Sequence, residues 1–301
     1  MKQAAFRILL VLRVLLGCVF LFSAIAKLVS IDRFELYVYS FGFIPLNAAF
    51  VLTRLCIAGE MLLGFGLVSN LYGRLVNAVT QIVLVLFCVF LCYAALIGRD
   101  DNCQCFGSLV EFNPVQSIVK NAVLFMWSLF VSRVPSFRWR PCWYLWGTLI
   151  GLCVMTPFLI SPLDQWAYRD DDRAIPYDQT LLKEHLASDS LFVCNRCHVG
   201  NKIMVFMSPR CPWCQMCVEK LQTMRRKFEL PDTAFVYVIP QPRVPVEMDY
   251  QPIIIPRELI SRLTYGHRPI VVFVQNGLPR QSRHYRALDE DEIRDFVFLG
   301  R

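Results

Sequence analysis

The residue pattern best suited to chemistry is a pair of cysteines in the C-terminal half. Residues 211–214 read Cys-Pro-Trp-Cys, follow an apolar stretch over residues 202–207, and open a segment that predicts a helix to about Phe228. A thiolate is the form of cysteine that attacks disulfides, and a helix N-terminus favours a negative charge. Arg210 adds a cation beside the first cysteine. We therefore expect a reactive thiolate at Cys211.

Further cysteines lie at short spacings in polar surroundings. Cys103 and Cys105 are separated by one residue, so a disulfide between them closes a small, strained ring that is easy to reduce. This pair suits exchange, with two free thiols or pairing to distant cysteines as alternatives. Cys194 and Cys197 read as an auxiliary dithiol or a local disulfide. Cys217 falls about two turns into the predicted helix, either buried or a third redox partner.

Two metal-binding interpretations compete with thiol chemistry. Together with residues 211–214, Cys194 and Cys197 give the pattern C-x2-C-x13-C-x2-C, which is close to zinc-ribbon spacing. Residues 194–198 read CNRCH, which matches covalent haem attachment. We expect neither, because the intervening residues are needed as a strand and no room remains for a haem-enclosing domain. The sequence therefore predicts no metal site and requires no cofactor.

Composition divides the 301-residue chain into an apolar and a polar part. The whole chain is 55% hydrophobic and 18% charged, against about 25% charged residues in an average soluble protein. The net charge of +7 does not predict nucleic-acid binding, because the basic residues lie in membrane loops or are scattered. Nearly all long apolar runs precede residue 163, and five approach the length of a bilayer-spanning helix: 8–29, 48–68, 75–97, 115–131 and 142–160.

The charges between these segments predict their orientation. If the segments alternate, the basic residues fall on one side, which should be cytoplasmic; they are Lys2, Arg7, Arg74, Arg133, Arg138 and Arg140. The loops 32–45 and 99–113, and everything after residue 161, then lie in the oxidising compartment. We expect a bacterial inner-membrane protein with a cytoplasmic N-terminus and a periplasmic C-terminal domain. A signal-peptide cleavage site at residues 24–26 is an alternative for the first segment.

Charged residues inside the apolar segments are costly and are usually paired or functional. Arg13, Lys27, Arg54 and Glu60 are such residues. For Glu60, we expect an interhelical ion pair with Arg13 or Lys27, with proton or quinone handling as the alternative.

Several residues of the apolar part form a recognisable set. They are Arg13, Gly17, Phe20, Ser23, Lys27, Glu60, Gly64, Asn121 and the run Cys103-Gln104-Cys105-Phe106-Gly107. Over about residues 6–132 this set resembles the MauE branch of the DoxX-like membrane family. The resemblance implies a four-helix bundle over 1–132, with a fifth span in 133–162 that carries the next domain across. MauE proteins are associated with methylamine utilisation and implicated in disulfide formation in a periplasmic dehydrogenase, and other DoxX relatives are linked to quinone.

The polar part follows a linker over residues 163–179. Its pattern predicts, in order, a strand at 202–207, a helix at 211–228, a strand at 234–239, a helix at 256–263, a hairpin of 270–275 and 280–285, and a helix at 289–298. Over residues 180–301 this order resembles the α/β thioredoxin fold. By that resemblance Cys211 is the attacking cysteine and Cys214 the resolving one. Pro269 matches the cis-proline that faces the active site.

The function we predict from the sequence is a thiol-disulfide relay. The soluble domain exchanges disulfides with periplasmic client proteins, the Cys103–Cys105 pair exchanges with that domain, and the helices in the lipid bilayer pass electrons on, with quinone as a candidate carrier. The direction of electron flow is left open. Two alternatives are a membrane-anchored accessory protein in which only the soluble domain is redox-active, and a zinc- or haem-binding redox sensor.

Overall fold

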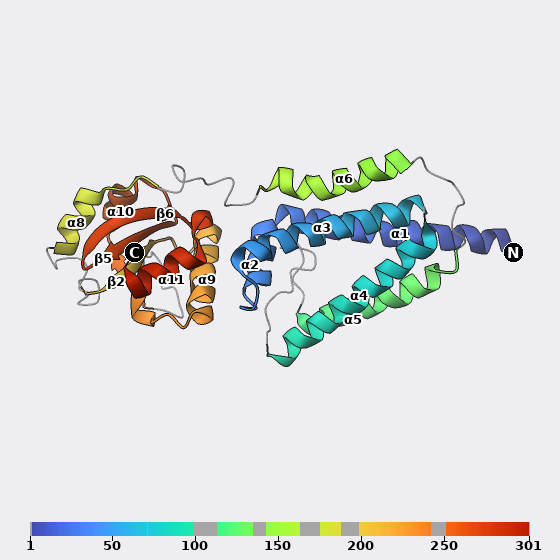
Figure 1. Ribbon diagram of the computed structural model, residues 1–301, viewed down its shortest axis with the longest axis horizontal. Coiled ribbons are helices and arrows are strands. Elements are labelled where there is room, and N and C mark those ends of the chain that lie inside the picture. Colours follow the sequence, from blue (N-terminus) through green and yellow to red (C-terminus); the bar gives the residue numbers. More distant parts are fainter. Residues whose placement is uncertain are drawn as a thin grey trace. The chain divides into compact units, whose positions relative to one another are not determined.

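The computed structural model describes residues 2–70, 72–98, 113–134, 143–162, 175–187, 199–241 and 251–300 (Figure 1). Its contacts divide the chain into two compact units. One unit comprises Met1–Val38 and Asn47–Pro162, and the other comprises Tyr39–Leu46 and Leu163–Arg301. The first unit is helical, and the described part of the second contains a five-stranded sheet with flanking helices.

The helical unit follows the apolar runs of the sequence. Its described helices are α1 (Lys2–Val29), α2 (Ile31–Tyr39), α3 (Leu46–Ser69), α4 (Gly73–Leu96), α5 (Pro114–Val131) and α6 (Trp143–Ile160). All the predicted apolar segments are therefore helical. Among the described residues, three helices, α1, α3 and α4, are long and apolar enough to cross a bilayer, whereas the apolar stretches of α5 and α6 are shorter. These lengths indicate an integral membrane protein.

Glycines bring two of the long helices into close contact. A Cβ atom placed on Gly17 of α1 would lie 2.9 Å from the carbonyl oxygen of Gly64 on α3 and 2.7 Å from a methyl group of Val68. A Cβ atom on Gly64 would lie 2.6 Å from Cγ of Leu21. Small residues allow membrane helices to approach in this way. In the same unit, α4 and α5 lie side by side (Figure 1).

The sequence predicts a loop over residues 32–45. The first part of this prediction is wrong, because Ile31–Tyr39 forms the helix α2. The residues from Phe34 to Tyr39 are all buried, whereas Asp32 and Arg33 at the start of the helix are not. The buried Glu35 accepts a hydrogen bond from the guanidinium of Arg54 on α3. The charge of Glu35 therefore has a partner in the fold.

The second unit is built on a mixed sheet. Its described strands are β2 (Asn201–Phe206), β3 (Phe235–Pro240), β4 (Ile253–Ile255), β5 (Ile270–Gln275) and β6 (Leu278–His284), and its helices are α8 (Gln179–Ala187), α9 (Pro212–Lys227), α10 (Arg257–Thr264) and α11 (Glu290–Leu299). The strand order is β4-β3-β2-β5-β6. β2, β3 and β4 run parallel, whereas β5 pairs antiparallel with both β2 and β6.

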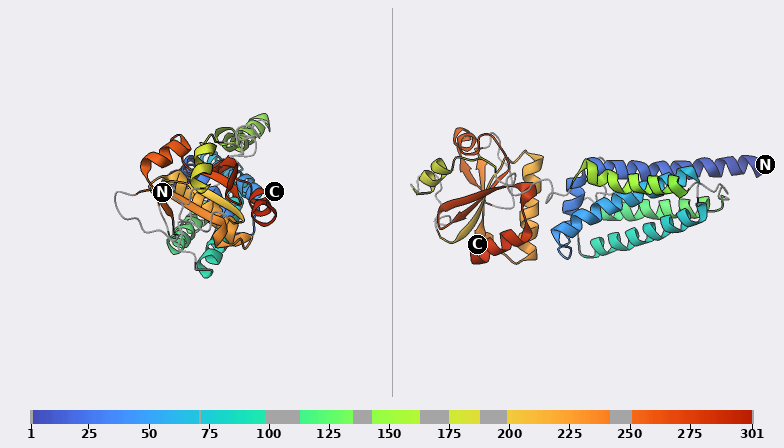
Figure 2. Two further views of the ribbon diagram at one scale, coloured as in Figure 1. Left: turned by 90° about the vertical axis from the view of Figure 1, so that its left-hand side faces the viewer. Right: turned by 45° about the horizontal axis from the view of Figure 1, so that its top comes forward.

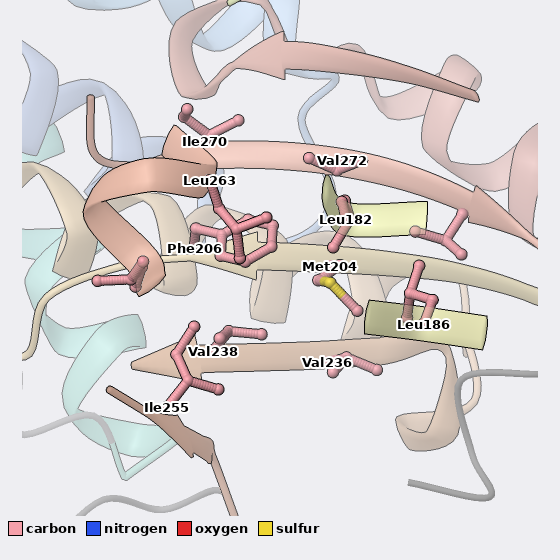
Figure 3. Close-up of a cluster of buried hydrophobic side chains, with 12 residues drawn as sticks. Leu182, Leu186, Met204, Phe206, Val236, Val238, Ile255, Leu263, Ile270 and Val272 are labelled. Carbon is pink, nitrogen blue, oxygen red and sulfur yellow. The ribbon is translucent and has the colours of Figure 1, made fainter. Parts of the chain in front are cut away.

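Helices cover both faces of this sheet (Figure 2). On one face, Met204 and Phe206 of β2 pack with Leu182 of α8 and Leu263 of α10 in a buried apolar cluster (Figure 3). The opposite face packs against α11, because Phe273 of β5 meets the Phe296 ring edge-on at 4.8 Å. The sheet is therefore a rigid middle layer from which the loop before α9 extends.

The structure adds two elements to those predicted in this unit. α8 begins where the linker was expected to end, and its buried Leu182 and Leu186 are one helical turn apart. β4 has three residues, too few for a period-two pattern to stand out. The expected cap of the last helix is present, since the Asp289 carboxylate accepts a hydrogen bond from the Asp291 N–H.

Candidate functional site

Cys211 lies at the N-terminus of the helix that follows the central strand. It is the N-cap residue of α9 with extended backbone angles (φ −89°, ψ 117°), and Pro212 occupies the first turn, where no backbone N–H is needed. The preceding turn closes through a hydrogen bond from the Cys211 N–H to the Ser208 carbonyl at 3.1 Å. The side chain of Cys211 is half-buried, so a partner protein is able to reach its sulfur.

Cys214 lies one turn further along α9 and is fully buried. Its sulfur accepts a hydrogen bond from the Ser208 N–H at 3.3 Å, and the Cys211 side chain is within hydrogen-bonding reach. Burial raises the pKa of the Cys214 thiol, and the Ser208 N–H opposes this effect. The two cysteines therefore differ in access: one is open to a partner, and the other is shielded directly behind it.

Cys217 lies a further turn along the same helix and is also fully buried. Burial raises its pKa to about 12, with the Lys220 ammonium acting in the opposite direction. Lys220 donates hydrogen bonds to the carbonyls of Tyr285 at 3.2 Å and Arg286 at 3.3 Å. Sequence reasoning missed Lys220, although its spacing of three from the buried Cys217 places it on the buried side of α9.

An aromatic and cationic rim, formed by Trp213, His284, Tyr285 and Arg286, lies beside the dithiol. The exposed Trp213 ring is 6.1 Å from the Tyr285 ring, and the Arg286 guanidinium lies 5.7 Å from the Trp213 ring centre. Burial lowers the pKa of His284 to about 4, aided by the charges of Arg286 and Lys220. The rim places the positive charge of Arg286 beside the exposed Trp213 ring. Sequence reasoning gave no signal for it, because the residues come from separate segments.

Pro269 lies at the same end of the strands as the loop between β2 and α9, which leads to Cys211. Its peptide bond with Arg268 is cis. Ile270, the next residue, pairs with Phe206 at the end of β2 and with His284 at the end of β6. The strand pairing therefore brings Pro269, His284 and the chain leading to Cys211 to the same end of the strands.

The predicted charged residues of the helical unit have defined partners. The Lys27 ammonium donates to both carboxylate oxygens of Glu60, at 2.6 and 2.8 Å, and to the Ser23 hydroxyl at 2.7 Å. Arg13 does not take part in this pair. It is fully buried and donates to the backbone carbonyls of Leu67 at 3.2 Å and Gly73 at 3.5 Å.

Four predicted site cysteines, Cys103, Cys105, Cys194 and Cys197, lie outside the described residues. Within the residues that the structure describes, no group of three or more His, Cys, Asp or Glu side chains is placed to hold a metal ion. The zinc and haem interpretations both need Cys194 and Cys197, so they stay untested. Within the described residues, the candidate site is thus the Cys211–Cys214 pair with its rim.

Comparison with known proteins identifies the membrane part. Residues 6–133 match the family model described as "Methylamine utilisation protein MauE", and this stretch is a MauE family membrane domain. "Protein TlpB" of Flavobacterium psychrophilum is 27% identical over 181 residues, which cover 57% of this chain and 48% of that protein. The chain thus spans about half the length of this curated relative. No solved structure matches the chain significantly.

Proposed function

We propose that this protein is a membrane-bound thiol-disulfide oxidoreductase. The observation that carries the proposal is the half-buried Cys211 at the N-terminus of α9, with the fully buried Cys214 within hydrogen-bonding reach behind it. Disulfide exchange proceeds by attack of one sulfur on another through a mixed disulfide. A pair with one accessible and one shielded thiol suits that sequence of events, because the shielded thiol releases the partner.

The proposed fold of the soluble domain is thioredoxin-like. β2, α9 and β3 form a parallel crossover unit, and the β5–β6 hairpin lies antiparallel on the other side of β2. Pro269 precedes β5 at the end of the sheet where the chain leaves β2 toward Cys211. This arrangement supports the assignment of Cys211 as the attacking cysteine and Cys214 as the resolving cysteine.

Electrons and protons are conserved between the Cys211–Cys214 pair and its client in the exchange step. In the oxidising direction, a client thiolate attacks the Cys211 sulfur of the Cys211–Cys214 disulfide, and Cys214 leaves with the electron pair. A second client thiol then displaces Cys211, so that the client gains a disulfide and the pair gains two electrons and two protons. Net reduction of a client uses the same atoms in reverse.

The membrane domain is proposed to exchange electrons with this pair. Cys103 and Cys105 pass two electrons and two protons to a lipid-soluble quinone, which becomes a quinol. The match of residues 6–133 to the MauE family is consistent with the role that the resemblance implies, which is disulfide formation in periplasmic client proteins. The proposed topology has five spans, a cytoplasmic N-terminus and a periplasmic soluble domain in the inner membrane of a bacterium.

The test uses the purified full chain in detergent, with exchange between its thiols and oxidised glutathione followed by mass spectrometry. We expect wild type and Cys18→Ser to equilibrate, because Cys18 is an exposed cysteine of α1 remote in sequence from the site. Cys211→Ser should abolish the oxidation of Cys214, because this fully buried thiol exchanges only through Cys211. Oxidation of Cys214 retained in Cys211→Ser would contradict the proposal.

The role of the membrane domain is tested separately. In cells, replacing Cys103 and Cys105 by Ser should leave the Cys211–Cys214 pair trapped in one redox state, while membrane insertion is normal. An unchanged redox state would reduce the membrane domain to an anchor. Zinc or haem bound stoichiometrically to the purified chain would instead favour a sensor.

A further inference from the structure

A small cavity with both polar and apolar lining lies within the helical unit, between α1, α3, α4 and α5. Its polar lining residues are Ser23, Lys27, Glu60, Lys120 and Asn121, and the lining from α4 is apolar. Charged groups inside a membrane domain are costly and usually mark ion or proton pathways. The cavity therefore needs an explanation beyond packing.

One wall of the cavity is a tightly held ion pair. Lys27 is 1% exposed, and its ammonium contacts both oxygens of Glu60. The Ser23 hydroxyl donates a hydrogen bond to one of these oxygens at 3.0 Å. Two donor groups thus hold the Glu60 carboxylate through three hydrogen bonds, and Glu60 lines the cavity. Lys120 on α5 also lines the cavity, and the thiol of Cys56, one turn earlier on α3, interacts electrostatically with Glu60 and Lys27.

The opposite wall carries an unsatisfied donor. Asn121 is 3% exposed, and among the described residues its side-chain Nδ2 has no hydrogen-bond partner. Leaving a buried polar group unpaired costs about 1–3 kcal/mol. An acceptor oxygen inside the cavity would remove this cost, so the geometry points to an oxygen-bearing occupant.

The size of the cavity decides between occupants. It offers about 40 Å³ to water-sized spheres, and one water molecule needs roughly 10–15 Å³ measured in this way. About three water molecules therefore fit. An aromatic ring does not, since an apolar cavity that binds benzene measures roughly 150 Å³. The polar partners that buried water requires, about two to four for each molecule, are supplied by the groups named above.

We propose that this cavity holds ordered water and that Glu60 exchanges protons with it, which makes the cavity a proton-exchange site inside the membrane domain. The carboxylate accepts a proton from a protonated water chain and becomes a carboxylic acid, while Lys27 stays an ammonium ion and keeps its bond to Ser23. The proton returns to the water when the carboxylate forms again. No electrons move in this step, so the inference does not depend on the proposed disulfide chemistry.

The first test detects the water. X-ray radiolysis converts ordered water to hydroxyl radicals in place, and mass spectrometry then finds the oxidised side chains. In the full chain embedded in nanodiscs of phosphatidylethanolamine and phosphatidylglycerol, we expect Phe20 and Phe87, which line the cavity, to be oxidised several-fold faster than the outward-facing Phe22. Asn121→Leu should remove that difference. Equal rates for Phe20, Phe87 and Phe22 in wild type would show a dry cavity and overturn the proposal.

The second test detects the proton. Infrared spectra of the same wild-type sample, recorded across a pH titration, should show a carboxylic acid band that grows on acidification and shifts in D2O. Because the chain has 24 Asp and Glu residues, the Glu60 contribution is the difference between the wild-type and variant spectra. Glu60→Gln should lose this contribution, and Glu60→Asp should keep it at a changed frequency. A wild-type spectrum in which Glu60→Gln removes nothing, or a band that does not shift in D2O, would mean that the ion pair is only a structural lock.

Discussion

The electrostatics of the dithiol rim predict that the folded domain keeps His284 neutral. Burial and the neighbouring charges of Arg286 and Lys220 lower its pKa from 6.5 to about 4. The unfolded chain takes up a proton near the ordinary value and the folded chain does so only at lower pH. The stability of the domain is therefore unaffected above pH about 6.5 and falls as the pH drops toward about 4.

The size of this loss follows from the same interval. At about 1.4 kcal/mol per pKa unit, the lowering of the His284 pKa from 6.5 to about 4 corresponds to a loss of about 3 kcal/mol in the free energy of unfolding. His284 is only partly buried, so solvent screening reduces the expected loss to about 1–2 kcal/mol. His284→Asn should remove most of this acid-induced loss, because the imidazole that takes up the proton is gone. The amide oxygen can replace Nδ1, which accepts a hydrogen bond from the Arg286 N–H at 3.3 Å. His267→Asn, at an exposed position, is the matched control.

Two measurements check the prediction on the full chain in detergent. The chain has four histidines, so His284→Asn identifies the imidazole signal of this residue in a nuclear magnetic resonance titration. Urea unfolding at several pH values then gives the stability. Titration of His284 near its ordinary value, or an equal acid loss in wild type and His284→Asn, would refute the reasoning.

Two further predictions concern the helical unit. Gly17→Ala brings a methyl group within 2.9 Å of the Gly64 carbonyl oxygen, so thermal unfolding should show a loss of stability of about 1–3 kcal/mol. Gly59→Ala, where a Cβ atom meets nothing within 4 Å, should be neutral. Equal losses in the two variants would contradict the close-contact argument. Arg54→Met leaves the buried Glu35 carboxylate without its cation and should cost about 3–5 kcal/mol; adding Glu35→Leu should recover much of that loss, and a double variant no better than Arg54→Met would argue against the pairing.

Much of the fold follows from periodicity and composition. The apolar runs predict the helices of the membrane part to within a few residues, because a bilayer demands long uninterrupted apolar segments. α2 was missed because its charged Glu35 finds its partner only through the tertiary contact with Arg54. β4 was missed because three residues carry too little pattern.

The candidate site was predictable where chemistry is local in sequence. The Cys211–Cys214 spacing after a strand predicts a dithiol at a helix N-terminus, and the structure places Cys211 at the N-cap. The Lys27–Glu60 pair was one of two expected pairings, and helix packing selects it, since Arg13 instead binds backbone carbonyls. The rim of Trp213 and Arg286 and the unsatisfied Asn121 depend on contacts between distant segments, which one sequence does not reveal.

The central claim is that Cys211 attacks and Cys214 resolves, and trapping the intermediate tests it most directly. Cys214→Ser removes the resolving thiol, so mixed disulfides between Cys211 and client proteins should accumulate in cells. Acid quenching, alkylation and non-reducing mass spectrometry would identify cross-linked peptides that contain residue 211. We predict mixed disulfides with client proteins in Cys214→Ser and none, through any cysteine, in the Cys211→Ser/Cys214→Ser double variant. Cross-links that persist in the double variant, or none in Cys214→Ser at normal expression, would contradict the account.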